Sequence, residues 1–157
     1  MINRATYLIL IALLLLAAPA GAGGNTGTVT EVMSGDLVRI GDSFVARLTG
    51  IATPDTSETL GREVFAFTKK ELEGKLVKLF TWTTDNTAAG IVRDGEGTAF
   101  VQIYYGEDFS ISFNELLLEK GYARVDGERL PEELADRYRE LEKKARETCL
   151  GIWKTGK

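Results

Sequence analysis

Apolar and polar residues alternate from about residue 28 onwards in a pattern typical of β-strands. The first three extended segments are expected at residues 28–32, 37–40 and 43–51. A tight turn at residues 41–42 separates the second segment from the third. Phe44 and Leu48 share one face of the third segment, so Arg47 points to the other face. The three segments therefore predict an antiparallel meander.

Helical periodicity follows in three places. Residues 60–72 repeat apolar positions at helical spacing and stop before Gly74, which suits a helix C-terminus. Residues 112–115 have the form of a capping box and begin a short helix that ends at Gly121. Pro131 suits the first turn of a last helix, whose other face carries mixed charges typical of a solvated surface. The apolar stripe of this helix consists of Leu134, Tyr138, Leu141, Ala145 and Cys149.

Strand patterns return after the first expected helix. They cover residues 76–82, 99–105 and 109–111, and a long polar loop at 83–97 separates the first two. Five or so short strands are too few for a sandwich, and a helix interrupts them. The order of elements therefore predicts an α+β fold, a small closed barrel capped by helices.

The first 22 residues have the features of a secretory signal peptide. Arg4 gives a positive start, residues 7–18 are apolar, and residues 20–22 form a small-residue cleavage signal. A retained membrane anchor is the alternative, but a spanning helix needs about 20 apolar residues. We therefore expect cleavage and export to the periplasm or the extracellular medium.

Cleavage would leave one folded unit. Residues 23–27 are rich in glycine and predict a flexible lead-in, and residues 28–155 are long enough for a single domain with one core. No transmembrane segment is expected in the mature chain, which we expect to be a monomer.

Charge and composition narrow the chemistry. The chain has 19 basic and 23 acidic residues, and loss of Arg4 with the signal peptide leaves a net charge of −5. This balance disfavours tight, sequence-independent binding of nucleic acid. The chain contains no histidine, which removes histidine bases and most zinc catalysis. The one cysteine, Cys149, is expected to be a small core residue, with a reactive thiol or an intermolecular disulfide as the alternative.

Several short strings occur in an order and spacing that resemble the thermonuclease family, also called staphylococcal nuclease-like. They are Gly35-Asp36, Arg47-Leu48, Thr53-Pro54-Asp55, residues 66–70, residues 114–117 with 121–125, and Gly151-Ile152-Trp153. The likeness covers about residues 28–153, and its strength lies in the set of strings rather than in any one of them. The resemblance implies an OB-fold, a five-stranded β-barrel capped by three helices, and a calcium-dependent nuclease of DNA or RNA.

The resemblance assigns a role in the nuclease site to individual residues between 36 and 55. Asp36 falls on the first calcium carboxylate and Arg47 on the first phosphate-binding arginine. Ala52 stands where the family has its second calcium carboxylate, and a methyl group cannot bind calcium. Thr53, whose carbonyl would help to hold the ion, is retained. Asp55 replaces the general-base glutamate with an arm one methylene shorter, and about 1 Å of misplacement can reduce a rate by on the order of a hundredfold.

The second phosphate-binding arginine of the family falls on Thr98, with Asp94 and Gly97 as the aligned neighbours. Loss of one such donor typically lowers the rate by about 10²- to 10³-fold. Arg93 or Asp85 from the long loop is a candidate replacement, and the alternative is that both are ordinary charged residues on a solvated loop. Two of five principal positions are thus kept, one is shortened and two are lost.

The retained residues also have purely structural interpretations. Gly35-Asp36 suits a turn, and Arg47 suits an ion pair with Asp36 or Asp55. Three functions therefore stay open. The first is an exported binding module with a degenerate nuclease site, whose ligand is single-stranded nucleic acid or a protein. The second is a divergent but active calcium-dependent nuclease, with calcium as its only cofactor, and the third is a structural envelope-associated domain.

The first of these functions draws support from aromatic residues on the last long strand. Tyr104 and Tyr105 would help to bind a ligand if they are exposed, although at least one of them is expected in the core.

Overall fold

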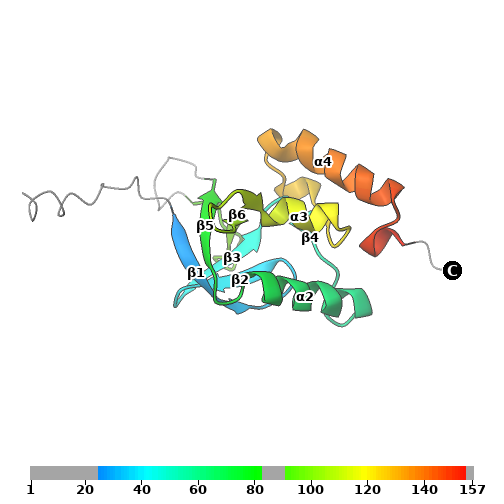
Figure 1. The fold of residues 1–157 in the computed structure, drawn as a ribbon. Coiled ribbons are helices and arrows are strands. Elements are labelled where there is room, and N and C mark those ends of the chain that lie inside the picture. Colours follow the sequence, from blue (N-terminus) through cyan, green and yellow to red (C-terminus); the bar gives the residue numbers. More distant parts are fainter. Residues whose placement is uncertain (1–24, 83–90, 155–157) are drawn as a thin grey trace, which may run out of the picture.

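A computed structural model describes residues 25–82 and 91–154, and its centre is a β-barrel (Figure 1). The barrel strands are β1 (Thr26–Val32), β2 (Leu37–Ile40), β3 (Phe44–Leu48), β5 (Leu76–Thr81) and β6 (Ala99–Tyr105). They pair in the order β3-β2-β1-β5-β6, and a parallel pairing of β3 with β6 closes the ring. The predicted α+β barrel is confirmed.

Short strands and three helices complete the described fold. Strand β7 (Ile111–Ser112) pairs with β6, and β4 (Ile51–Ala52) pairs with β8 (Arg124–Val125) in a separate ribbon. The helices are α2 (Thr59–Leu72), α3 (Phe113–Glu119) and α4 (Glu132–Glu147), with short 3-10 turns at Gly127–Arg129 and Gly151–Trp153. No helix in the described ranges has the length and apolar character that crossing a membrane requires. The expected signal peptide, residues 1–22, lies outside the described residues.

The core follows from the strand alternation. Ala46 and Leu48 of β3 are fully buried inside the barrel, whereas Arg47 between them is partly exposed, as the period of two predicts. Helix α2 buries Val64 and Leu72 toward the barrel and ends before Gly74, which has a positive φ of 76°. Each fully buried aliphatic side chain contributes about 1.5–3 kcal/mol.

Strand β1 begins two residues earlier than the predicted start at residue 28. Thr26 and Gly27 pair with β5, so the expected flexible lead-in is wrong for these two residues. A Cβ atom on Gly27 would clash with Cγ2 of Ile40. The glycine therefore permits a close approach to β2 rather than chain flexibility.

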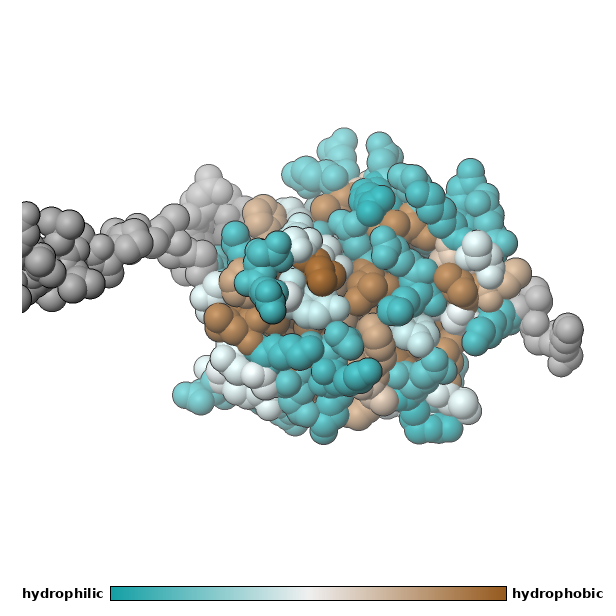
Figure 2. Space-filling model, viewed as in Figure 1, coloured by the Kyte–Doolittle hydropathy of each residue, from teal (hydrophilic) through white to brown (hydrophobic). Residues whose placement is uncertain are grey.

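The charged face of α4 is solvated, as expected. Figure 2 shows hydrophilic side chains along the edge of the molecule that α4 forms. Pairs four residues apart stabilise this face, for example Lys144 with Glu140 at 2.8 Å and Arg146 with Glu142 at 3.3 Å. Its buried face carries Tyr138, as predicted.

Cys149 does not lie in the core, and the prediction that it extends the apolar stripe is wrong. Helix α4 ends at Glu147, and Cys149 is exposed with a left-handed φ of 52°. The N–H of Leu150 donates to the carbonyl of Ala145, and the N–H of Cys149 donates to that of Arg146. These two bonds form a Schellman motif, with Cys149 at the position that glycine usually occupies.

We expect Cys149→Gly to raise the free energy of unfolding by about 0.5–1 kcal/mol, because glycine adopts a positive φ without steric cost. Urea denaturation of both proteins in reducing buffer measures the difference. Thr148→Gly serves as the control, since the φ of Thr148 is −96° and the same change there should lower stability. A loss of stability in Cys149→Gly would contradict the steric cost that we assign to the positive φ of Cys149.

Asn114 connects α3 to the closing seam of the barrel. It is fully buried, and its Oδ1 accepts the N–H of Ile103 at 3.1 Å. Its Nδ2 donates to the carbonyls of Thr49 at 3.1 Å and Val101 at 3.3 Å. One side chain thus satisfies backbone groups at the end of β3 and in the middle of β6.

We expect Asn114→Ala to lower the free energy of unfolding by about 2–4 kcal/mol, because it leaves at least two buried backbone groups without partners. Chemical denaturation followed by circular dichroism measures this loss. The matched control is Asn25→Ala, an exposed site at which the change should stay within about 0.5 kcal/mol. Equal effects of the two substitutions on stability would contradict the role of Asn114 in holding the β3–β6 seam.

Candidate functional site

Asp36 is the centre of the candidate site, and both of its carboxylate oxygens are occupied. Its Oδ2 accepts from Nη1 of Arg47 at 3.1 Å. Its Oδ1 accepts from Oγ of Ser34 at 2.7 Å and from Oγ1 of Thr53 at 3.2 Å. The residue is only 7% exposed. The carboxylate is therefore neutralised and bound by the protein itself.

Local sequence explains this convergence. Asp36 lies in the turn before β2, and Leu37 pairs with Arg47 across the β2–β3 ladder. The N–H of Leu48 also donates to the backbone carbonyl of Asp36 at 2.8 Å. A Cβ atom on Gly35 would come within 2.8 Å of Oγ1 of Thr53, so glycine is needed for the turn to approach that residue.

Ala52 and Asp55 have different surroundings. Ala52 pairs with Arg124 in the β4–β8 ribbon and offers only a methyl group. The carboxylate of Asp55 is exposed and accepts the N–H of Ser57 at 2.8 Å. This backbone hydrogen bond is the main cause that lowers the pKa of Asp55.

Asp55 lines a pocket of about 420 Å³ with residues 52–54, Glu58, Leu60, Arg124 and Ile152. Asp36 and Arg47 are not among the residues that line this pocket. The expected general base therefore lines a hollow that does not include the expected calcium carboxylate.

Asp94 is a neighbour of the site that sequence reasoning treated only as an aligned position. Its Oδ1 accepts the N–H groups of Thr98 at 2.9 Å and Glu96 at 3.0 Å. The bond from Thr98 is the main cause that lowers the pKa of Asp94, and the positive charge of Arg47 lowers it further. The turn pattern Asp-Gly-x-Gly before a strand was the available signal.

Thr98, where the family has its second arginine, and Arg93, the candidate replacement, both lie just before β6. Thr98 is buried, and its side chain carries no charge that could replace the family's arginine. Nη1 of Arg93 donates to the carbonyl of Gly97 at 2.7 Å, and its guanidinium lies 5.2 Å from the ring centre of Phe44. Neither contact joins Arg93 to Asp36. Asp85 lies outside the described residues.

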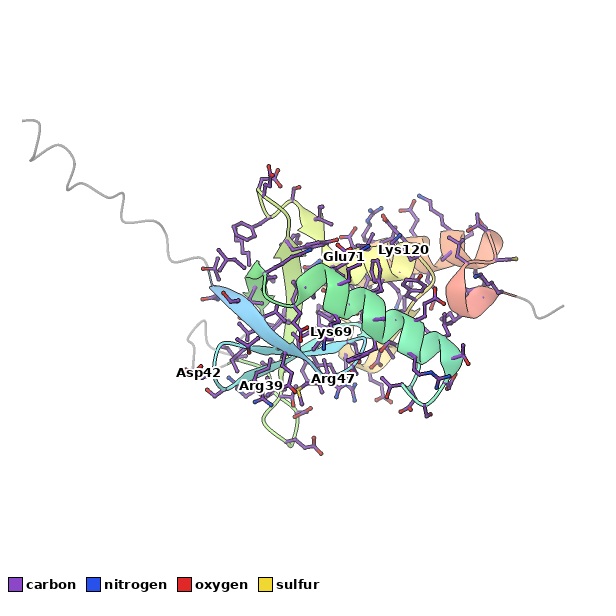
Figure 3. All side chains as sticks on the ribbon, turned by 60° about the horizontal axis from the view of Figure 1, so that its bottom comes forward. Arg39, Asp42, Arg47, Lys69, Glu71 and Lys120 are labelled. Atoms are coloured by element: carbon purple, nitrogen blue, oxygen red, sulfur yellow. The ribbon has the colours of Figure 1, made fainter. Side chains whose placement is uncertain are left out.

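Other charged side chains near the site lie on separate elements, and some of them form ion pairs. Figure 3 shows Arg39 and Arg47 on the β2–β3 side of the barrel, with Lys69 and Glu71 on α2. Arg39 binds Glu31 at 2.9 Å. Within residues 25–82 and 91–154, no three acidic, histidine or cysteine side chains are grouped as metal ligands.

The donor set does not fit the calcium ion that the resemblance implies. Calcium takes 6–8 oxygen ligands, and Asp36 is the one carboxylate that the resemblance aligns with a calcium ligand of the family. An ion at Asp36 would have to displace Arg47 and two hydroxyl groups. The arrangement is instead that of a partly buried ion pair with hydroxyl support.

We expect the Asp36–Arg47 pair to stabilise the fold. A double-mutant cycle with Asp36→Ala and Arg47→Ala should give a coupling of about 1–2 kcal/mol, because the pair is largely shielded from water. The pair Glu31–Arg39, exposed on the neighbouring strands, is the control and should couple by about 0.5 kcal/mol or less. Urea denaturation of the seven proteins, the wild type and three variants for each pair, gives both values, and equal couplings would contradict a structural role for Asp36.

Comparison with known proteins agrees with the barrel and its seam. The family model described as "Staphylococcal nuclease homologue" matches residues 45–155. The chain is also similar to the uncharacterized protein MJ1439 of Methanocaldococcus jannaschii, with 29% identity over 152 residues, which covers 81% of this chain and 70% of that protein. The family match covers more than two thirds of the sequence and includes most of β3, the three helices and β6. The chain belongs to the staphylococcal nuclease homologue family.

Proposed function

We propose that this protein is an exported binding module on the staphylococcal nuclease fold, with a nuclease site that no longer supports calcium-dependent cleavage. The closed Asp36–Arg47 pair carries the proposal. An arginine that is paired with the expected metal ligand is not free to bind phosphate, and the paired carboxylate is not free to bind calcium.

Two further features support the proposal. Ala52 and Thr98 lack the carboxylate and the guanidinium that the family uses, and Asp55 binds the backbone of its own turn. The OB-fold barrel is a frequent scaffold for ligand binding, so loss of cleavage leaves a usable surface. The ligand we propose is a protein segment or a single-stranded nucleic acid, bound by a monomer in the periplasm or outside the cell.

A divergent nuclease is the second candidate, and one observation favours it. Asp94 lies close enough to Arg47 for the charge of Arg47 to lower its pKa. Asp94, in the turn before β6, is thus a second carboxylate near Arg47. Calcium would be the cofactor in that case.

The deciding measurement is cleavage of single-stranded DNA, duplex DNA and RNA by the purified protein, with calcium and with chelator. We expect no calcium-dependent cleavage above the background of Arg47→Ala. Asp36→Ala and Asp94→Ala are assayed in parallel.

Each outcome has a defined meaning. Cleavage that requires calcium and disappears in Arg47→Ala would overturn the proposal. If it also disappears in Asp94→Ala, Asp94 is the replacement carboxylate. A positive control is the triple variant Ala52→Asp, Asp55→Glu, Thr98→Arg, in which the family's side chains are restored.

A further inference from the structure

A groove with aromatic walls lies between the β5–β6 side of the barrel and the start of α4. It consists of two hollows of about 380 Å³ and about 410 Å³, and Trp82 and Glu133 line both. We call it the aromatic groove and define it by its aromatic and acidic wall residues. These are Phe80, Trp82, Phe100, Tyr104, Glu128, Glu132 and Glu133.

The strand pattern builds one wall of the groove. Lys78 and Phe80 of β5 point outward, and Phe80 pairs with Gln102 of β6. Phe80 is 55% exposed, and its ring meets that of Trp82 edge to face at 5.2 Å. Phe80 is thus an exposed ring that packs on the half-buried Trp82, and a large exposed aromatic ring beside a hollow is typical of a contact surface.

The start of α4 builds the other wall. Pro131 fixes where the helix begins, and Glu132 and Glu133 follow in its first turn. Figure 1 shows the first turn of α4 on the same side of the molecule as the end of β5. Leu134 of α4 and Tyr104 of β6 also line the groove.

The groove carries unpaired negative charge. Among the described residues, no lysine or arginine forms an ion pair with Glu128, Glu132 or Glu133. The one basic residue of the lining, Arg129, is paired with Asp126 at 3.5 Å. A phosphate backbone would meet these carboxylates at close range, whereas a cationic ligand would be attracted.

The groove already holds one cation on an aromatic ring. The guanidinium of Arg129 lies 5.5 Å from the ring centre of Phe100. No lysine or arginine of the described ranges lies over the rings of Phe80, Trp82 or Tyr104. These rings can therefore accept a cation from a ligand, with Glu133 beside them as the counter-charge.

We propose that the aromatic groove binds a basic peptide segment, with an arginine or lysine side chain against Phe80 and Trp82 and its charge near Glu133. This inference rests on the proposed function and deepens it, because it selects a protein ligand over nucleic acid. The stem of an arginine or lysine suits the apolar part of the groove, and its charged end suits the acidic wall.

Binding is tested with an acetylated, amidated hexa-arginine peptide and the full chain. Trp153→Phe leaves Trp82 as the one tryptophan, so Trp82 fluorescence reports on the groove, and calorimetry gives the affinity. We expect Phe80→Ala to weaken binding about tenfold and Glu133→Gln about three- to tenfold. The matched control is Glu140→Gln on the same helix, where Glu140 binds Lys144, and its effect should be below about twofold.

The alternatives are outcomes of the same experiment. Equal losses in Glu133→Gln and Glu140→Gln would reduce the binding to general attraction to an acidic surface and overturn the inference. A deoxythymidine decamer that quenches Trp82 and displaces the peptide would assign the groove to nucleic acid. Absence of binding at millimolar peptide concentration would also overturn the inference. The nuclease assay is independent of the groove, so failure here and failure of the proposed function can be told apart.

Discussion

The parallel pairing of β3 with β6 is the constraint on which the rest of the structure depends. It closes the barrel, and Asn114 bridges it by binding backbone groups of both segments. A buried amide with all its partners is strongly directional, so it fixes α3 against one register of the seam. The same register places Arg47 opposite Phe100 and brings the turn at Asp94 beside it. Closure of the barrel therefore also determines which side chains can reach the candidate site.

The barrel and the helices could be predicted because their signals are local. Alternation in residues 43–51 determines that Arg47 faces away from Leu48. The capping box at residues 112–115 marks the start of α3, where the side chain of Ser112 accepts the N–H of Glu115. Tyr105 is buried and Tyr104 partly exposed, as the same alternation requires.

The parts that could not be predicted depend on contacts or on backbone geometry. Cys149 continues an apolar spacing, but the helix ends in a Schellman motif two residues earlier, and spacing alone does not reveal a left-handed residue. Asp94 lies far from Arg47 in sequence, and only the closed seam brings them together. The ion pair of Asp36 with Arg47 was one of two interpretations that the sequence left open, because a turn aspartate and a metal aspartate share one sequence pattern.

The replaced positions are consistent with one another in electrostatic terms. The resemblance places a carboxylate at Ala52 and an arginine at Thr98, so by this alignment the chain lacks one negative and one positive charge of the family's pattern. The pair that remains, Asp36 with Arg47, is neutral and satisfied without an ion. A carboxylate at Ala52 alone would add a negative charge next in sequence to Thr53, which binds Asp36, with no new cation to balance it. A functioning metal site would therefore need several coordinated changes, whereas the carboxylates of Glu132 and Glu133 in the aromatic groove already lie on its wall without an ion-pair partner among the described residues.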